Sequence, residues 1–478
     1  MTPPIRATLS ERKPETELAN GAALSGAQWS AADRAAFAGG IRAIVNDGTF
    51  PVSTGVVFLD PRSGRPLYEH GPDIPLVPAS TMKLVVAAAA LRTLGSAHRF
   101  TTRLVATGPL RGGVIEGDVY LVGSGDPELS SHDLNEAALA LTRAGVRLIS
   151  GGVYADGSEF GADGVSSTWS SEDLIYGWAA PASAVCIDNG AIQFTVTPAA
   201  SGQPASVDVQ PPGAIDRLDG SIATVAFGAD TELRIDPAPT DGTYLLSGQI
   251  PEGVPQKFWR SLSHPTPRAA IILTTILRRH GIAVAGPTGV ATAPRAAQLL
   301  WTHRSRPLTA IVKKMWFDSD NHYAEQLLRA VGYATRGLGT PKNGFAAERD
   351  VLDRMAADPP GVRLADGSGL SPDNRVTALM LGSVLRSLAL GTNGEQIISL
   401  LPRVGIDGTV RAHPIGAAAT GRVYGKSGYI EGVSGLAGYI KTAHHGLLIY
   451  VFLVNDWTTS LDAVWAAEGR MLDEASRW

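Results

Sequence analysis

The sequence predicts a mixed α/β protein in which the two ends of the chain form one domain and a β-rich middle is inserted into it. Helical and strand-like patterns alternate near both ends, whereas the middle has short alternating stretches separated by Gly, Pro, Asp and Ser. In addition, 478 residues are too many for one ordinary hydrophobic core, so two or three domains are expected. We therefore predict a domain of residues 29–98 and 303–478, interrupted by a β-rich region of residues 99–302.

The N-terminal part of the chain predicts a tail, a helix, a pair of strands and a second helix. Residues 1–28 mix prolines with charges and show no periodicity, so we expect a disordered tail. The helix that follows has apolar residues spaced for one face and ends at an Asn-Asp-Gly turn: Phe37, Ile41, Ile44 and Val45. A strand over residues 54–60 and a return strand through Leu67 flank a Pro-Arg-Ser-Gly turn. A strongly helical run then covers residues 82–94 and is closed by Gly95.

Elements of both kinds are predicted in the rest of the chain. Composition favours further helices in four places: 266–281, 308–315, 323–331 and from about residue 460 onward. Alternation and apolar runs favour strands near the C-terminus: 422–428, 434–442 and 447–454. The last of these is an eight-residue apolar run, far too short to span a bilayer, so no integral membrane segment is expected.

Composition and charge narrow the class of protein. Hydrophobic residues make up 44% and charged residues 18%, which is typical of a soluble globular protein. The net charge is −4 and no cluster of Lys or Arg occurs, so we expect no nucleic-acid partner. The single cysteine, Cys186, excludes an intrachain disulfide and lies in an apolar stretch, where we expect a buried structural thiol. The first 26 residues lack the apolar core of a signal peptide, so either a leader was removed or the protein stays in the cytoplasm.

Ser80 and Lys83 form an S-x-x-K pair at the start of a predicted helix, where residues three apart share one face. A serine hydroxyl is a weak nucleophile until a base takes its proton, and a lysine can be that base when burial or nearby cations lower its pKa. The helix N-terminus also offers a backbone N–H that can stabilise an oxyanion. The pattern arises by chance as well, since Ser10 and Lys13 match it within the predicted tail. Only Ser80 opens a helix.

Ser319-Asp320-Asn321 lies between two predicted helices. Ser319 can pass a proton toward a leaving group, and Asn321 can donate a hydrogen bond to a substrate amide. The alternative is a helix cap, because Ser and Asp are favoured at helix N-termini. Without the other motifs, the triplet would be interpreted as a helix cap.

Lys426-Ser427-Gly428 lies on a predicted strand, whose alternation puts Lys426 and Gly428 on one face and Ser427 on the other. Gly428 lets a substrate backbone approach closely, and Lys426 adds charge that lowers the pKa of a neighbouring ammonium and attracts an anion. The alternative is an ordinary surface lysine. Each motif is weak evidence by itself, but the three together indicate a catalytic site. S-x-x-K, S-D-N and K-[ST]-G, in this order, are the set used by enzymes that acylate an active-site serine.

These motifs resemble those of the low-molecular-mass class C penicillin-binding proteins, the D-alanyl-D-alanine carboxypeptidase/endopeptidase family S13. The 239 positions from Ser80 to Ser319 fit that family, and the similarity extends from about residue 50 to the end. It includes further stretches: Val122-Gly-Ser-Gly-Asp-Pro127, Trp169-Ser-Ser-Glu-Asp-Leu-Ile-Tyr176, Ala180-Pro181 with Ser183-Ala184, and Asp366-Gly-Ser-Gly-Leu-Ser371. The resemblance implies an α/β (α+β) transpeptidase domain like those of penicillin-binding proteins and serine β-lactamases, with residues 99–302 forming two small inserted domains.

The resemblance implies a serine D,D-peptidase that acts on peptidoglycan stem peptides as a carboxypeptidase, an endopeptidase or both, and that β-lactams inhibit. Ser80 would be acylated with Lys83 as its general base. Ser319, linked to both lysines, would return a proton to the leaving D-alanine, and the backbone N–H groups of Ser80 and Tyr429 would form the oxyanion hole. No metal or organic cofactor is implied. In relatives a cluster from the insertion contacts the amine-bearing end of the stem peptide, which by position would be Trp169, Asp173 and Tyr176; local packing is the alternative reading of these three.

Tyr429 departs from the family, which usually reads K-T-G-T at this strand. Ser427 keeps the first hydroxyl, but Tyr429 replaces the second, which in relatives helps to hold the terminal carboxylate. Glu431 places a further acidic group near the site, and this disfavours a bound carboxylate. We therefore predict that terminal D-alanine is released more weakly than internal cross-links are cleaved, or that the natural substrate is an amide or an ester.

Two other functions stay open at this stage. One is a cytoplasmic serine acyltransferase, cyclase or amidase on the same scaffold, which the lack of a visible leader and Tyr429 favour. The other is a β-lactam or muropeptide sensor that is acylated without turnover, although the complete catalytic set argues against it. The family implies a periplasmic or extracytoplasmic location, whereas the absence of a visible leader keeps a cytoplasmic one open.

Overall fold

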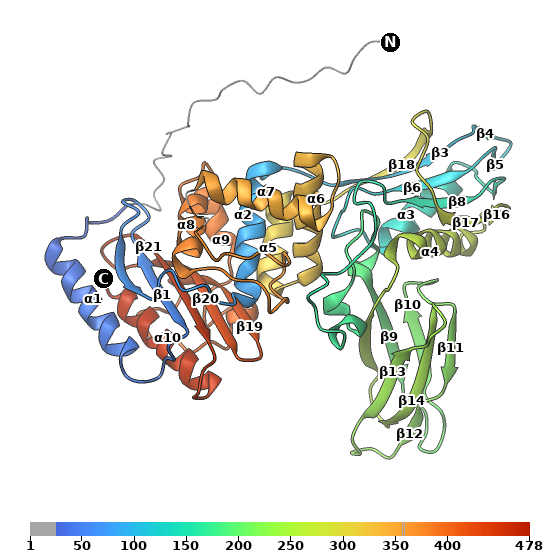
Figure 1. Cartoon of the computed structure of the whole chain (residues 1–478). Helices are drawn as coiled ribbons and strands as arrows, with labels where there is room; N and C mark the ends of the chain where they lie inside the picture. The colour runs from blue at the N-terminus through green and yellow to red at the C-terminus, as the bar shows by residue number, and fades with distance from the viewer. Residues whose placement is uncertain (1–24, 356, 358) are drawn as a thin grey trace, which may run out of the picture.

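The computed structural model describes residues 25–355, 357 and 359–478, and it confirms the mixed α/β fold (Figure 1). Both ends of the chain meet in one antiparallel sheet of strand order β19-β20-β21-β1-β2. Its strands lie where the sequence predicts them: β1 (Thr54–Leu59), β2 (Pro66–His70), β19 (Val423–Ile430), β20 (Val433–Lys441) and β21 (Leu447–Asn455). Strand β1 pairs with β21, with Val57 opposite Val451. The predicted joining of the two chain ends therefore takes place in the sheet.

Each face of this sheet is covered by helices, which explains why β21 is buried along its whole length and reads as a continuous apolar run. Successive residues of β1 point to opposite faces, so Val56 belongs to one hydrophobic core and Val57 to another. The first core contains residues of α1 (Ala31–Val45) and α10 (Leu461–Ser476). Helix α1 begins with a capping box at Ser30, and its predicted apolar face is buried except for Ile44, which is half-buried.

A layer of helices covers the other face of the sheet. Its members are α2 (Lys83–Thr93), α5 (Leu308–Asp318), α6 (Asn321–Arg336), α7 (Pro341–Arg354), α8 (Ala378–Ala389) and α9 (Gly394–Leu400). Helix α2 lies at the centre of this layer, because every residue from Lys83 to Ala90 is buried. The helices predicted at 82–94, 308–315 and 323–331 are confirmed. Helices α7, α8 and α9 were not predicted from the sequence.

The end of the predicted N-terminal tail is part of the folded structure. Residues 1–24 of that tail, including Ser10, lie outside the described residues. The backbone N–H of Ala27 donates to the carbonyl of His444 at 2.9 Å, and Arg62 donates to the carbonyls of Gly26 and Ala27 at 3.0 Å. These bonds tie the segment to two turns, the one between β20 and β21 through His444 and the one between β1 and β2 through Arg62.

The inserted region begins and ends in a layered α/β unit with its own core. Two sheets have the orders β17-β8-β6-β3-β18 and β16-β7-β5-β4. Their bounds are β3 (Thr101–Ala106), β4 (Leu110–Arg111), β5 (Val114–Ile115), β6 (Val119–Val122), β7 (Leu148–Ile149), β8 (Val153–Asp156), β16 (Ala283–Val284), β17 (Thr288–Val290) and β18 (Gln298–Arg304). Helix α4 (Pro265–Arg279) confirms the helix predicted at 266–281. Helix α3 (Ser131–Arg143) was not expected, although its capping box of Ser130 and Asp133 is visible in the sequence.

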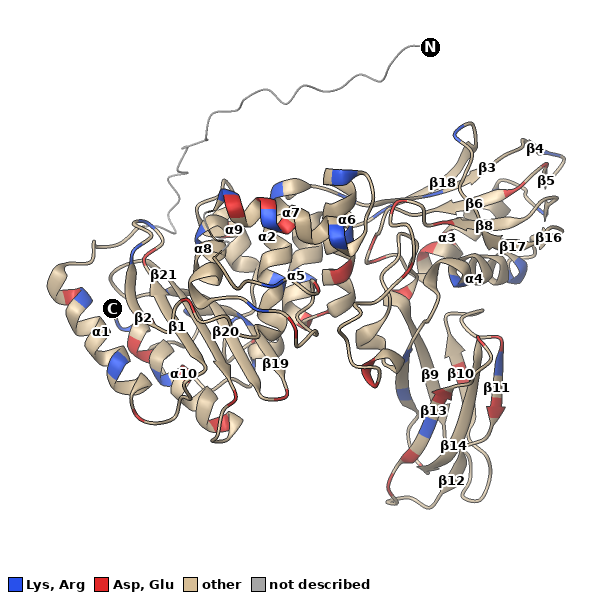
Figure 2. Cartoon of the chain, viewed as in Figure 1, with Lys and Arg blue, Asp and Glu red and all other residues tan. Residues whose placement is uncertain are grey.

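The middle of the insertion is a second unit, made of strands around another core. Its sheets have the orders β10-β9-β15 and β11-β14-β12, with β13 beside β14. Their bounds are β9 (Ala191–Thr197), β10 (Ser206–Gln210), β11 (Arg217–Gly220), β12 (Ala223–Val225), β13 (Glu232–Pro237), β14 (Thr243–Pro251) and β15 (Gln256–Ser261). We propose that the two units, with their separate cores, are the two small inserted domains. Figure 2 shows acidic and basic residues interspersed over all parts of the chain that the structure describes.

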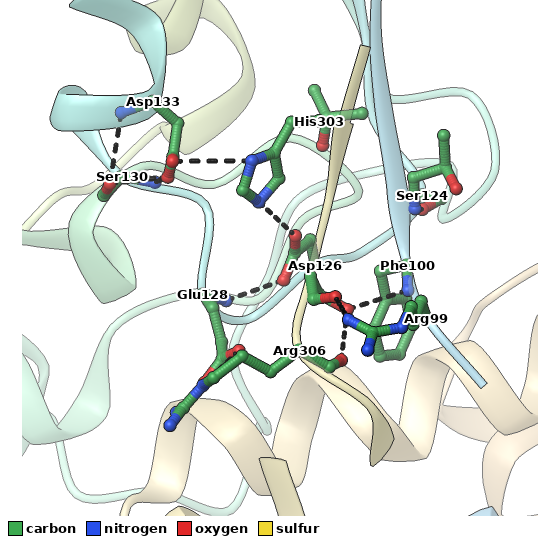
Figure 3. Close-up of polar contacts among 12 residues, drawn as sticks. Arg99, Phe100, Ser124, Asp126, Glu128, Ser130, Asp133, His303 and Arg306 are labelled. Carbon is green, nitrogen blue, oxygen red and sulfur yellow. Dashed lines mark hydrogen bonds and ion pairs between the residues drawn. The ribbon is translucent and has the colours of Figure 1, made fainter. Parts of the chain in front are cut away.

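A network of polar contacts joins the insertion to the helical layer (Figure 3). The ring of His303, at the end of β18, lies between two carboxylates, with 3.4 Å from Nε2 to Asp126 and 3.4 Å from Nδ1 to Asp133. The nearby carboxylate of Asp126 raises the pKa of His303 above its ordinary value. Next to it Arg306 forms an ion pair with Glu128. The connection between the insertion and the helical layer is therefore lined by charged side chains in contact with one another.

None of the helices within residues 25–355, 357 and 359–478 combines the length and the hydropathy that crossing a bilayer requires.

Candidate active site

Ser80 lies on the short 3-10 helix η2 (Ala79–Met82), directly ahead of α2. Ala79 has a φ of +45°, a conformation that side chains with a Cβ rarely adopt, and this sharp turn presents Ser80 at the start of the helix. Lys83, three residues on, is fully buried, and its Nζ lies 2.9 Å from Ser80 Oγ. The predicted pairing of nucleophile and base is therefore present in the geometry.

The ammonium group of Lys83 meets two further acceptors, Asn321 Oδ1 at 2.7 Å and the carbonyl of Ser368 at 2.6 Å. Burial lowers the pKa of Lys83 to about 8, although nearby carboxylates oppose this effect: Asp366, Asp320 and Glu325. At pH 7 about a tenth of Lys83 is therefore the neutral amine, far more than for a lysine with its ordinary pKa. With its N–H groups directed at the two acceptors, the amine's lone pair can face Ser80 Oγ and take its proton.

Ser319 and Lys426 form a second hydroxyl–amine pair, with 3.0 Å between Oγ and Nζ. Ser319 ends α5 in the left-handed region at φ +58°, and this conformation places it between α5 and α6. Lys426 on β19 is fully buried, and burial together with the charge of Lys83 lowers its pKa well below the ordinary value. The sequence predicts that Lys426 lowers the pKa of Lys83; in the structure the main cause of that shift is the burial of Lys83 itself.

Asn321 begins α6 and is held at both ends of its amide. Its oxygen accepts from Lys83, and its Nδ2 donates to the backbone carbonyl of Trp178 at 3.0 Å. The sequence predicts that Asn321 donates to a substrate amide, but here one of its two N–H bonds is directed at Trp178. Trp178 carries no expectation from the sequence; the signal for it is its place two residues after Tyr176 in a stretch rich in aromatic residues.

Strand β19 runs beside the nucleophile turn. A Cβ built on Gly428 would lie 2.7 Å from the carbonyl oxygen of Pro78 and 2.9 Å from the backbone nitrogen of Ser80. Gly428 is thus needed where the strand meets the turn, rather than only for the approach of substrate. The burial along the strand confirms the predicted alternation, and Ser427 Oγ lies 2.9 Å from Thr409 Oγ1.

A loop that starts at Asp366 supplies the carbonyl that holds Lys83. Asp366 is fully buried and accepts from the backbone N–H groups of Gly369 at 2.7 Å and Ser371 at 2.6 Å. Glu325 on α6 accepts from the N–H of Ser368 at 2.9 Å, and burial raises its pKa to about 7. The sequence analysis uses the D-G-S-G-L-S stretch only as part of the resemblance, whereas the structure shows that its Ser368 carbonyl binds Lys83.

Trp169 belongs to this support rather than to an open surface. Its side chain is buried, and its Nε1 donates to Asp366 Oδ2 at 2.7 Å. This burial favours the packing alternative for Trp169, and its contact with substrate stays a prediction. Without knowledge of the fold, nothing in the sequence pairs two residues 197 positions apart.

Asp173 and Tyr176 do lie together, and both contact Trp178. Trp178 Nε1 donates to Asp173 Oδ1 at 3.3 Å, and the rings of Tyr176 and Trp178 stack with 4.2 Å between their centroids. Trp178 is 51% exposed, and its carbonyl binds Asn321. An acidic and aromatic cluster of Asp173, Tyr176 and Trp178 is therefore present beside the S-D-N triplet.

Cys186 agrees with a structural role, whereas Tyr429 and Glu431 are exposed at the end of β19. Cys186 is buried, and burial raises the pKa of its thiol well above the ordinary value, as expected for a packed rather than a reactive cysteine. Tyr429 is 57% exposed, and its ring stacks at 6.3 Å on Trp457. Glu431 is exposed just after it.

Comparisons with known proteins agree with this geometry. The model of the D-Ala-D-Ala carboxypeptidase 3 (S13) family matches residues 38–471. A D-alanyl-D-alanine carboxypeptidase of Actinomadura sp. is 34% identical over 403 residues, which are 81% of this chain and 75% of that protein. The D-alanyl-D-alanine carboxypeptidase DacB of Haemophilus influenzae is 28% identical over 396 residues, 80% of this chain and 81% of the relative.

A solved structure extends the likeness to the fold as a whole. The crystal structure of penicillin binding protein 4 (dacB) from Haemophilus influenzae superposes with a TM-score of 0.79 at 25% identity, over 92% of this chain and 99% of that one. The match includes the insertion as well as the helical layer, since so little of either chain is left out. With its S-x-x-K, S-D-N and K-S-G residues gathered around Ser80, the chain belongs to the D-Ala-D-Ala carboxypeptidase 3 (S13) family.

Proposed function

We propose that the protein is a serine D,D-peptidase that cleaves peptidoglycan stem peptides through an acyl-enzyme on Ser80. The observation that carries this is the buried amine of Lys83, 2.9 Å from Ser80 Oγ and with a pKa lowered to about 8. The named relatives, D-alanyl-D-alanine carboxypeptidases, support this class of substrate. An acyltransferase, a cyclase or a sensor without turnover is not favoured.

The geometry supports a two-step reaction. Ser80 Oγ attacks the carbonyl carbon of the peptide bond while Lys83 takes its proton, and the negative charge on the carbonyl oxygen faces the backbone N–H groups of Ser80 and Tyr429. The bond to the leaving amine then breaks as Ser319, paired with Lys426, hands it a proton. The proton that Lys83 took from Ser80 then restores the Ser319 hydroxyl, so both groups return to their starting forms. In the second step Lys83 takes a proton from water as the water oxygen attacks the acyl carbon, and this proton passes to Ser80 Oγ when the bond to the carboxylate product breaks.

Penicillins are proposed to acylate the same serine. The Haemophilus influenzae penicillin binding protein 4 has also been crystallised with a β-lactam bound. A strained amide that opens on Ser80 leaves no separate amine to depart, so the adduct is expected to be long-lived. Because peptidoglycan lies outside the cytoplasmic membrane, we also propose that the protein works in the periplasm or another extracytoplasmic space.

We further propose that cross-linked peptides are cleaved faster than terminal D-alanine is released. Tyr429 offers an exposed ring where relatives carry a hydroxyl, and Glu431 repels a terminal carboxylate. Thr409 brings a second hydroxyl to Ser427, with 2.9 Å between the oxygens, so carboxypeptidase activity is weakened and not lost. The site therefore keeps both activities and favours the endopeptidase.

Purified protein given a D-Ala-D-Ala pentapeptide and a cross-linked muropeptide dimer is expected to cleave the dimer roughly ten times faster, the low end of the effect of one lost hydrogen bond to a charged group. Mass spectrometry of the products measures both rates. The variant Tyr429→Thr is the matched control and should shift the ratio toward the pentapeptide. A wild-type preference for the pentapeptide contradicts the substrate proposal, and failure to cleave either peptide contradicts the proposed function.

The acylation rate is expected to rise with pH through about 8. Burial lowers the pKa of Lys83 to that value, and below it the ammonium form cannot accept the proton of Ser80. Stopped-flow labelling with a fluorescent penicillin between about pH 6 and pH 10 measures this profile, with circular dichroism at each pH to confirm that the fold is intact. A rate that falls across this interval would show that Lys83 is not the base.

A further inference from the structure

One side chain of the insertion reaches the S-D-N triplet directly. Asn189 Nδ2 donates to Asp320 Oδ2 at 3.0 Å. The other carboxylate oxygen of Asp320 accepts from the backbone N–H of Tyr323 at 3.2 Å and so caps α6. Both oxygens of Asp320 are therefore engaged, one by its own helix and one by the inserted region.

Asn189 is itself held in an unusual and well-anchored conformation. It belongs to the short 3-10 helix η5 (Asp188–Gly190), where Asp188 and Asn189 have consecutive positive φ values of 51° and 61°. The backbone N–H of Asp188 donates to the carbonyl of Leu129 at 3.0 Å, and its carboxylate accepts from the N–H of Ser131 at 3.0 Å. Left-handed backbone at non-glycine residues persists only where the surroundings fix it, and such residues gather at functional sites.

The residues on each side of Asp320 carry the proposed proton chemistry. Ser319 is in the left-handed region and contacts Lys426 Nζ at 3.0 Å, while Asn321 contacts Lys83 Nζ at 2.7 Å. If the backbone at Asp320 changed its conformation, Ser319 and Asn321 would both move, because they are its direct neighbours in the chain. Errors of about 1 Å in such groups can cost about 100-fold in rate.

We propose that Asn189 is a positioning residue for this reaction: through its hydrogen bond to Asp320 it fixes the turn that aligns Ser319 and Asn321 with the two lysines. The inference rests on the proposed function and extends it, since it gives the inserted region a part in catalysis besides contact with substrate. Asn189 acts through Asp320 and touches neither Ser80 nor either lysine among the hydrogen bonds of the described residues.

Three variants test the proposal by acylation with a fluorescent penicillin, which gives a maximal rate constant and a half-saturating concentration. Asn189→Gly suits the positive φ and is expected to keep the melting temperature while it lowers the maximal rate constant about tenfold, with a smaller change in half-saturation. Asn189→Asp, which sets two carboxylates face to face, is expected to lose more. The exchange Asn189→Asp with Asp320→Asn again pairs an amide with a carboxylate, keeps a good helix cap, and is expected to recover at least about fivefold over Asn189→Asp alone.

The variant Asn135→Ala is the matched control, because Asn135 is an insertion asparagine whose bonds go to Ser131 and His280, within the insertion. It is expected to be acylated like the wild type. An unchanged rate constant in Asn189→Gly, or an exchange variant that folds but is no faster than Asn189→Asp, would overturn the positioning role. Wild-type protein that is not labelled at Ser80 would instead overturn the proposed function, so the two failures are distinguishable.

Discussion

Replacing Ser80 with alanine is expected to abolish both the penicillin adduct and the cleavage of stem peptides, with a loss of at least about 10⁴-fold in turnover. The reason is chemical, since no other hydroxyl lies within hydrogen-bond reach of Lys83 in the part of the chain that the structure describes. Intact-mass spectrometry after incubation with penicillin, and release of D-alanine and dimer cleavage products, measure the two effects. The melting temperature should change little, because Ser80 is half-buried and makes its side-chain contact with Lys83.

The chain supplies its own control for this experiment. Ser10 and Lys13 match the same S-x-x-K pattern, so Ser10→Ala is expected to leave labelling and turnover at the wild-type level. Peptide mapping of the wild-type adduct should place it on the peptide that contains Ser80. An adduct that survives in Ser80→Ala, or that maps to Ser10, would contradict the assignment of the nucleophile.

The sequence was sufficient for those parts of the site that short-range rules describe. Ser80 and Lys83 are three residues apart on one helix start, and the spacing alone brings their side chains together. The alternation of β19 likewise predicts that Lys426 and Gly428 are buried together. The joining of the chain ends was inferred from composition, because short alternating stretches rich in turn residues set most of the middle apart from the two ends.

The parts that sequence analysis missed depend on contacts between distant segments. The carbonyl of Ser368 binds Lys83 across 285 positions, and the indole of Trp169 binds Asp366 across 197. No local pattern distinguishes a tryptophan that supports a buried loop from one on an exposed surface, so the sequence could not show that Trp169 packs against Asp366 while Trp178 contacts Asp173. The same holds for Asn189, whose contact with Asp320 exists only because the insertion folds back on α6.

The helix cap at the S-D-N triplet is compatible with the catalytic role that we propose for it. Asp320 caps α6 through the N–H of Tyr323, which was the simpler reading of the triplet. The cap fixes the first turn of α6 and thereby fixes Asn321, while Ser319 terminates α5 in the left-handed region. The helix cap formed by Asp320 thus keeps Ser319 and Asn321 in the positions that the proposed reaction requires.

Replacing Lys83 with methionine is expected to lower acylation by about 10³-fold at neutral pH and to remove the rise of rate through about 8. Methionine fills a similar volume, so the fold should persist, while Asn321 Oδ1 and the carbonyl of Ser368 lose their donor. Lys83→Arg separates charge from basicity, because a guanidinium keeps the positive charge but does not give up its proton. Stopped-flow labelling across pH, with wild type and both variants side by side, measures the effect. If Lys83→Arg were acylated at more than about a tenth of the wild-type rate, Lys83 would act through its charge and not as the base.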